Sequence, residues 1–278
     1  MNERIAGPIA ASGRILRVEV TTACETGSAH RRQQRGSDDA VGWTGAGAVL
    51  ATVAVADGHS DPRCVRRRLG ADFVVAAAAA LPPEPLTPSA MADAFISDWR
   101  RRVDQHLAGN PLTPADAAAD AAWRANARMA YGTTALLCRI TQDAVAVVRI
   151  GDGDVIAVAT DGRARRLVAP EPRSDGSTES ISHPDAQRAA LSLAIPAAAA
   201  PILMLLATDG FDNAYPAEDS MLRAATELAE LRRDSGRPIG SDVLNRWARE
   251  AADVSGDDAT VAAIWIETAA TGGMARAR

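Results

Sequence analysis

The chain has 278 residues, of which 47% are hydrophobic, and a formal net charge of −5. This apolar content, with no long hydrophilic break, predicts one sizeable core. The negative charge argues against nonspecific binding to nucleic acid or to an anionic membrane. The cysteines are odd in number and scattered, so they indicate neither a disulfide framework nor a zinc site. Residues 1–17 lack an apolar segment of signal-peptide length, and the longest apolar span, residues 73–81, is far shorter than the ~20 residues of a membrane helix. We therefore expect a cytoplasmic protein.

The N-terminal part predicts a flexible tail over residues 1–14 and then a half-buried strand, because residues 15–20 alternate between apolar and polar. A polar segment follows over residues 21–40, and residues 42–47 predict a turn. Residues 49–56 are an unbroken run of small and β-branched apolar residues, typical of a strand buried on both faces. This run ends in Asp57-Gly58-His59, so Asp57 is expected at the rim of a sheet. A hairpin of this length can bring Asp39 to the same edge.

The next part predicts helices. Residues 64–81 carry apolar side chains at helical spacing, with Arg66, Arg67 and Arg68 on a solvated face. A second helix is expected to begin at the N-cap Ser89. Its core-facing stripe recurs at steps of four: Met91, Phe95, Trp99, Val103 and Leu107. A third helix is expected over residues 113–129, because a Thr-Pro pair is a typical helix start.

The second half begins with short segments at residues 133–140, 144–150, 155–160 and 163–168, which predict an antiparallel meander with a hairpin turn at Asp161-Gly162. Residues 169–201 predict a functional or mobile loop with one short helix near 185–191. A buried strand over residues 202–208 then ends in Asp209-Gly210. Helices at 217–233 and 241–254, a strand at 259–266 and a tail at 268–278 complete the chain. This order favours two packed antiparallel sheets covered by helices.

Acids stand at the ends of several predicted strands. Asp-Gly by itself is a common turn dipeptide, so the argument depends on the whole set, which is Asp38, Asp39, Asp57, Asp209, Asp257 and Asp258. Carboxylates with a backbone carbonyl suit Mg²⁺ or Mn²⁺. Because so many carboxylates would repel one another, we expect two cations ~3.5–4 Å apart, bridged by Asp57 and by a water. Water held in this way becomes a nucleophile, and its natural target is a phosphate ester.

A series of motifs in chain order resembles the protein phosphatase 2C (PPM) family of metal-dependent serine/threonine phosphatases. The motifs are Asp38-Asp39-Ala40, Val55-Ala56-Asp57-Gly58-His59, Tyr131-Gly132-Thr133-Thr134-Ala135, Ile150-Gly151-Asp152-Gly153, Leu206-Ala207-Thr208-Asp209-Gly210-Phe211 and Asp257-Asp258-Ala259-Thr260-Val261. The resemblance extends from residue 15 to residue 266. The stretch Gly27-Ser28-Ala29-His30 is similar to a bacterial branch of that family.

The resemblance implies an α+β fold, a four-layer αββα sandwich with two Mn²⁺ or Mg²⁺ ions between the sheets. Residues 15–267 would form a single catalytic domain between the two tails. The metal ligands carried over by position are Asp39, Asp57, Asp209 and Asp257, with the Gly58 carbonyl assisting and Asp57 bridging. His59 would be the general acid that protonates the leaving alkoxide. One of three arginines would hold the substrate phosphate, namely Arg31, Arg32 or Arg35. Residues 169–201 stand where the family carries a flap that shapes substrate choice.

The chain departs from the family pattern at several positions. Asp38 replaces a common Glu, so we assign it, with Asp258, to a second shell around the metals, where Asp38 would hold a water. Ser60-Asp61-Pro62 replaces glycines. Residues 125–131 contain no acid, which leaves a third metal without its usual ligand and favours slow turnover. We interpret Asp152 as structural, and expect His30 to orient the Arg-rich loop.

The first functional hypothesis is an active Mg²⁺/Mn²⁺-dependent phosphoprotein phosphatase. It would be a monomer that opposes a serine/threonine kinase in signal transduction and binds neither nucleic acid nor membrane. The intact acid set and His59 favour it.

The alternative is a catalytically weak or inactive phosphatase-like regulatory or binding module. This alternative is favoured by the lack of an acid that would bind a third metal and by Asp38 in place of the common Glu. A hydrolase of small phosphorylated molecules is a third hypothesis.

Overall fold

The computed structural model describes residues 13–113, 124–167, 178–215 and 219–269. In these ranges the strands are β1 (Ile15–Glu25), β2 (Ala40–Ala46), β3 (Val49–Ala56), β4 (Ala135–Thr141), β5 (Ala144–Ile150), β6 (Asp154–Val158), β7 (Ala164–Arg166), β8 (Leu191–Pro196), β9 (Leu203–Ala207) and β10 (Ala259–Thr268). The helices are α1 (Ser28–Arg32), α2 (Arg67–Ala79), α3 (Pro88–Gly109), η1 (Ala127–Tyr131), α6 (Ala186–Ala189), η2 (Ala197–Ala199), α7 (Asp209–Asp212), α8 (Ser220–Ser235) and α9 (Ser241–Ser255).

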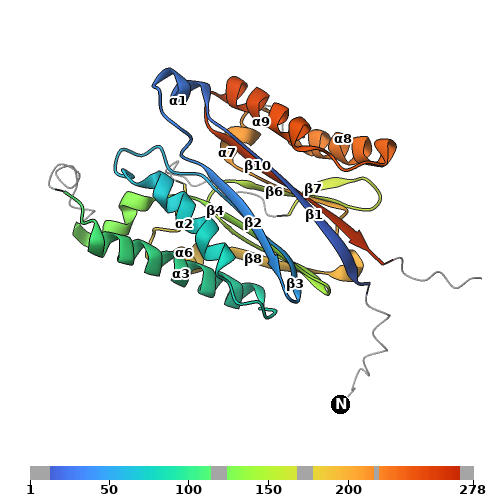
Figure 1. The fold of residues 1–278 in the computed structure, drawn as a ribbon, viewed down its shortest axis with the longest axis horizontal. Helices are drawn as coiled ribbons and strands as arrows, with labels where there is room; N and C mark the ends of the chain where they lie inside the picture. Colours follow the sequence, from blue (N-terminus) through green and yellow to red (C-terminus); the bar gives the residue numbers. More distant parts are fainter. Residues whose placement is uncertain (1–12, 114–123, 168–177, 216–218, 270–278) are drawn as a thin grey trace, which may run out of the picture.

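The strands form two antiparallel five-stranded sheets, in the orders β1-β10-β9-β6-β7 and β2-β3-β4-β5-β8. Figure 1 shows the sheets in the middle of the molecule, with α2 and α3 on one outer side and α8 and α9 on the other. The predicted α+β fold, a four-layer αββα sandwich, is confirmed. In the described part of the chain, none of the helices combines the length and the apolar character that a membrane span needs.

Three hydrophobic clusters separate the four layers. One lies between the sheets, and each of the others lies between a sheet and its covering helices. The predicted stripe on α3 is confirmed, because Phe95 and Trp99 are fully buried. Trp99 also donates from Nε1 to the carbonyl of Gly70 over 2.9 Å, which joins α3 to α2. Both faces of each sheet are therefore covered, and functional polar groups are left to the sheet edges.

The strand register brings the acids to one edge of the sandwich. Ala40 of β2 pairs with Ala56 of β3, so Asp39 and Asp57 lie at the same end of that hairpin, as predicted. In the other sheet Ala207 pairs with Val261, and Thr208 N donates to Thr260 O over 2.9 Å. The start of α7 and the residues before β10 therefore lie together as well.

The turn predicted at residues 42–47 is wrong, because most of that range belongs to β2. The glycines there serve packing as well as turning. A Cβ added to Gly42 would lie 2.5 Å from Cγ1 of Val75, so glycine lets α2 approach the sheet. The turn itself is at Gly47, which has a positive φ of 59°.

The predicted four-strand meander is also wrong. β4 and β5 pair in one sheet, whereas β6 and β7 pair in the other. The chain changes sheets between Ile150 and Asp154, where Gly151 has a φ of 101°. Alternation of apolar residues identifies strands but does not tell which sheet each one joins. The hairpin turn at Asp161-Gly162 is confirmed, and Gly162 has a φ of 86°.

Several boundaries differ from prediction. Thr87 caps α3 in place of Ser89, because its side chain accepts from Ala90 N. The region 169–201 contains α6 as expected and also β8, which its Ala- and Pro-rich flanks concealed. The helix predicted over 113–129 falls partly outside the described residues, and its end is the 3₁₀ helix η1. Thr268 still belongs to β10, while the predicted tails lie mainly outside the described residues.

Candidate active site

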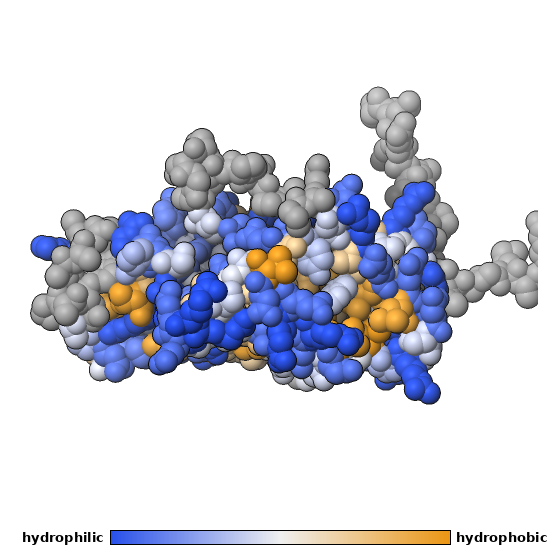
Figure 2. Space-filling model, turned by 90° about the horizontal axis from the view of Figure 1, so that it is seen from above, coloured by the Kyte–Doolittle hydropathy of each residue, from blue (hydrophilic) through white to orange (hydrophobic). Residues whose placement is uncertain are grey.

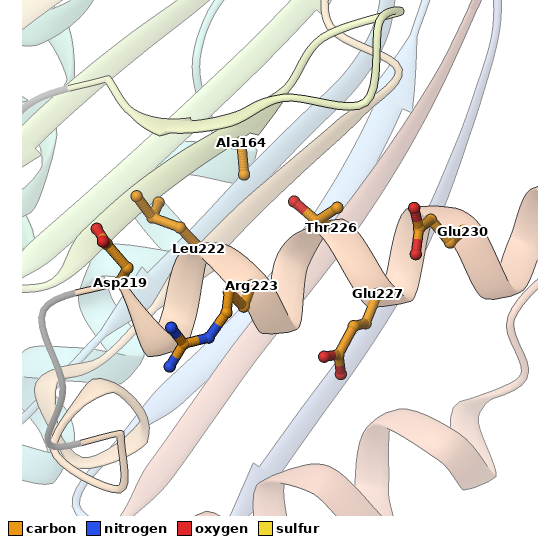
Figure 3. Close-up of a pocket in the computed structure, with 7 residues that line it drawn as sticks. All are labelled: Ala164, Asp219, Leu222, Arg223, Thr226, Glu227 and Glu230. Carbon is orange, nitrogen blue, oxygen red and sulfur yellow. The ribbon is translucent and has the colours of Figure 1, made fainter.

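A polar cavity lies at the edge where the acids gather. It is lined by His30, Asp57, Gly58, His59, Ser60, Asp152, Thr178, Asp209, Asp257 and Asp258. A second hollow runs between α8 and β7, and its lining is Ala164, Asp219, Leu222, Arg223, Thr226, Glu227 and Glu230 (Figure 3). That hollow is made of side chains on an outer helix surface and contains none of the predicted site residues. The first cavity is therefore the candidate active site.

Two threonines fix the backbone of Asp57. Asp57 N donates to Thr134 Oγ1 over 3.1 Å. Its carbonyl accepts from Thr133 Oγ1 at 2.6 Å and from Thr134 N at 2.9 Å. His59 N donates to Gly132 O over 3.1 Å. The predicted Gly-Thr-Thr motif therefore holds the turn that carries Asp57, Gly58 and His59.

Asp39 and Asp209 come from different sheets. Asp209 lines the cavity, whereas Asp39 is buried beside it as a neighbour of Asp57. Asp39 is fully buried, and its Oδ2 accepts from Thr208 Oγ1 at 3.0 Å. Its Oδ1 has no hydrogen-bond partner among the described residues. Asp209 begins α7, and a Cβ on the next residue, Gly210, would lie 2.1 Å from Asp258 O. Glycine is therefore required for α7 to start beside the residues that precede β10.

Asp258 holds the N-terminal loop against the site. Its carboxylate is buried and accepts from Gly27 N at 2.7 Å and from Asp38 N at 2.6 Å. His30 Nδ1 lies 3.0 Å from each carboxylate oxygen, which orients the Arg-rich loop as expected. Asp257 is exposed at the cavity mouth, and its Oδ1 accepts from Asp258 N at 2.8 Å.

Burial shifts the pKa of several groups in and beside this cavity. It raises the pKa of Asp39 and Asp57 well above the usual range and also raises that of Asp209, and repulsion from neighbouring carboxylates adds to each shift. Burial lowers the pKa of His59, while Asp152 and Asp61 act in the opposite direction. The carboxylates thus lie in a setting that disfavours their charged forms unless positive charge is supplied.

The donor chemistry of the cavity fits a hard cation. The acids offer oxygen ligands only, and the unpartnered Oδ1 of Asp39 is a buried acceptor without a donor. Within the described ranges, no three acid, histidine or cysteine side chains already form a metal-binding group. The fit therefore rests on the type of donors and on this unpartnered oxygen.

The three candidate arginines lie outside the lining of the cavity. Arg31 donates to Thr26 O and to Asp253 of α9, and Arg32 donates to Ser28 Oγ over 3.4 Å. Arg35 pairs with Asp38 at 2.7 Å, so it is the candidate that the structure places beside a site acid. Asp38 itself pairs with Arg35 and with Arg67, at 3.1 Å.

The sequence interpretation missed two features of the cavity. Asp152, interpreted as structural, lines it, and its Oδ2 accepts from Thr178 Oγ1 at 2.7 Å. The Gly-Asp-Gly motif could have indicated a site residue. Whether Asp152 lines the cavity, however, depends on where the chain crosses from one sheet to the other. The arginines at the start of α2 are a solvated face only in part, because Arg68 is exposed whereas the Arg67 side chain is only 17% exposed. Arg68 Nη1 donates to Ser37 O and Asp39 O over 3.0 and 2.9 Å.

Comparison with known proteins matches residues 26–249 to the family model described as Protein phosphatase 2C. No curated protein matches the chain in sequence. Solved structures share the fold. PppA, a key regulatory component of T6SS in Pseudomonas aeruginosa, is 14% identical with a TM-score of 0.61, over 91% of this chain and 100% of that chain.

Two further matches are to serine/threonine phosphatases. PstP/Ppp of Mycobacterium tuberculosis is 16% identical with a TM-score of 0.60, over 91% of this chain and 100% of that chain. A catalytic domain of PstP in complex with 2 manganese ions is 15% identical with a TM-score of 0.58, over 91% of this chain and 99% of that chain. At these identities the matches show a common fold.

The raised carboxyl pKa values predict how pH changes the stability of the metal-free chain. A carboxyl with a raised folded pKa keeps its proton to higher pH in the folded state than in the unfolded state. The stability that it contributes is full below about pH 4, the unfolded pKa, and is lost as the pH rises through the folded pKa. Asp212, whose pKa burial and Asp154 raise to about 6, adds to this trend. In chelator, the free energy of unfolding from urea titration should therefore fall between pH 5 and pH 8.

Two comparisons check the cause. Asp57→Asn should reduce the pH dependence of the metal-free chain, because one buried ionisable group is gone. Mn²⁺ at 100 times its dissociation constant should stabilise the wild type at pH 8 by about 2.7 kcal/mol. A metal-free stability that rises from pH 5 to pH 8 would contradict this account.

Proposed function

This chain belongs to the protein phosphatase 2C family, and we propose that it is a metal-dependent phosphatase that hydrolyses phosphoserine and phosphothreonine in proteins. The observation that carries the proposal is the meeting of Asp39, Asp57 and Asp209 at one edge of the sandwich with their pKa values raised by burial. The manganese complex of the structurally similar PstP domain supports the same reading.

Two Mn²⁺ or Mg²⁺ ions would be held by Asp39, Asp57, Asp209 and Asp257 with the Gly58 carbonyl, Asp57 serving both. Bound there, the ions would supply an acidified water and offset the charge of the phosphate. We propose no third metal, since residues 125–131 offer no acid. The second-shell roles are assigned to Asp38 and Asp258, and the contacts of Asp258 support a role in holding the loop of residues 27–38.

His59 is proposed to protonate the leaving alkoxide. His59 lines the cavity, and its buried Nε2 has no hydrogen-bond partner among the described residues, so no protein group there competes with a substrate for this nitrogen. Gly132 packs on the ring, since a Cβ there would lie 3.1 Å from His59 Cδ2. For the substrate phosphate we favour Arg35 over Arg31 and Arg32, because Arg35 lies beside Asp38 at the site.

The domain, the substrate class and the cellular role are proposed together with this chemistry. We propose that residues 15–267 act as one catalytic domain on a phosphoprotein substrate, opposing a serine/threonine kinase in cytoplasmic signal transduction. We propose a monomer, which is consistent with the one face seen in Figure 2, where hydrophobic residues form separate groups within a hydrophilic surface. The net charge of −5 argues against a nucleic-acid or anionic-membrane partner.

A second candidate is a catalytically weak or inactive phosphatase-like regulatory module. The observation that favours it is that no metal-binding group is preformed within the described residues. Such a module would bind a phosphopeptide or a metal without useful turnover. Hydrolysis assays separate the two candidates.

Replacing Asp209 tests the enzyme directly. The wild type should hydrolyse a phosphothreonine peptide with Mn²⁺ or Mg²⁺ and stop in chelator, because the acids need a cation to act. Asp209→Asn should lower kcat/KM by at least about 10²-fold. Loss of an outer partner of a metal ligand typically costs about 10–100-fold, and Asp209 is proposed as a ligand itself. Rates are measured as phosphate release at matched protein concentrations.

Asp234→Asn is the matched control, since Asp234 is exposed and pairs only weakly with Arg233, at 3.6 Å. It should keep the wild-type rate. A folded wild type that binds Mn²⁺ but releases no phosphate would contradict the enzyme and favour the regulatory module.

His59 is tested through the leaving group. His59→Gln should lower kcat by about 10²–10⁴-fold on a phosphoserine peptide, whose alkoxide needs a proton. The loss should be much smaller on p-nitrophenyl phosphate, whose phenolate leaves unaided. Equal losses on both substrates would show that His59 does not act as the general acid.

A further inference from the structure

Arg67 lies between two segments of the site. Its side chain is 17% exposed, and its Nε is 3.1 Å from Asp38 Oδ2. Its Nη1 donates to the carbonyl of His59 over 2.9 Å. A Cβ added to Gly58 would lie 3.1 Å from Cβ and Cγ of Arg67, so the arginine stem packs directly on the Asp-Gly-His turn.

These contacts join chain segments that carry different site residues. The loop before β2 brings Asp38 and Asp39, and the turn after β3 brings Asp57, Gly58 and His59. Gly58 of the turn is enclosed between the Arg67 stem and the loop, because its added Cβ would also lie 2.7 Å from Asp38 O. One side chain thus contacts both the loop and the turn.

The local sequence at this point is unfavourable for a helix. Arg66 is the N-cap of α2 and Arg67 its first residue, with no acid in the first turn. A helix N-terminus carries partial positive charge, so consecutive arginines there are disfavoured. Each is offset by oxygen acceptors from neighbouring segments, such as Tyr131 Oη for Arg66 at 2.8 Å. Local rules are most often broken where a site requires it.

We propose that Arg67 is a positioning residue for the metal site, which keeps Asp39 on one segment and Asp57 with the Gly58 carbonyl on the other at ligating separation. This inference rests on the proposed function. It extends that function, because Arg67 is not among the residues that line the cavity and would act through Asp38 and His59. Its guanidinium also neutralises Asp38, which lies among other carboxylates.

The geometry requires an arginine. A planar guanidinium presents several N–H donors in a fixed fork and can serve a carboxylate and a carbonyl at the same time, whereas a lysine ammonium is a point charge. Arg67→Lys should therefore keep the charge beside Asp38 but lose the His59 contact. Arg67→Met keeps the packing on Gly58 and loses both contacts.

The test compares Arg67→Met and Arg67→Lys with wild type by calorimetric titration of Mn²⁺ into the metal-free full chain. Outer partners of metal ligands typically contribute 10–100-fold to metal affinity. We expect Arg67→Met to raise the Mn²⁺ dissociation constant by about 10-fold or more, with Arg67→Lys between it and the wild type. Hydrolysis of a phosphothreonine peptide at saturating Mn²⁺ should show a lower kcat with little change in KM.

Arg101→Met is the matched control, because Arg101 is half-exposed on α3 and pairs with Asp98. It should bind Mn²⁺ like the wild type. If Arg67→Met does not fold, as judged by circular dichroism, Arg67→Lys decides by the same titration.

The outcomes separate this inference from the proposed function. A folded Arg67→Met, or Arg67→Lys in its place, with wild-type Mn²⁺ affinity overturns the inference and leaves the function intact. Weaker Mn²⁺ binding by the variant alongside a wild type that binds Mn²⁺ but lacks hydrolysis supports the inference and contradicts the enzyme. A wild type that binds no Mn²⁺ contradicts both.

Discussion

The burial of neighbouring carboxylates at one edge of the sandwich is the constraint on which the rest of the site depends. Burial raises the pKa of Asp39, Asp57 and Asp209, so each resists ionisation in the metal-free chain. A folded protein keeps such a cluster only if other parts of the structure hold it in place. The free energy of the closed hydrophobic layers provides that support.

The acids are held by backbone contacts more than by one another. Thr133 and Thr134 fix Asp57, Asp258 fixes the loop that carries Asp38, and Gly210 allows α7 to begin beside β10. The Asp258 contact joins the segment before β10 in one sheet to the loop before β2 in the other, so the complete site exists only when the sheets pack together. A cation at this edge would then meet carboxylates whose backbone is already held in place.

The sequence indicates that several acids lie at strand ends, because runs of apolar residues stop there and a strand end is visible in the pattern. The buried runs before Asp57 and Asp209 are examples. The sheet to which each strand belongs is not visible, because β5 and β6 look alike in sequence and differ only in long-range pairing. Arg67 and Asp152 were misjudged for the same reason, since their roles depend on contacts with residues far along the chain. The choice of Arg35 depends on the direction of a loop that Asp258 sets.

Crystals grown with Mn²⁺ and measured at the manganese absorption edge test the central claim most directly, because anomalous scattering locates the ions without reference to activity. The account predicts two manganese peaks in the cavity between the sheets, with Asp57 contacting both and with Asp39, Asp209 and Asp257 contacting one or the other. Manganese peaks only outside this cavity, or none at a concentration that stabilises the chain, would contradict it.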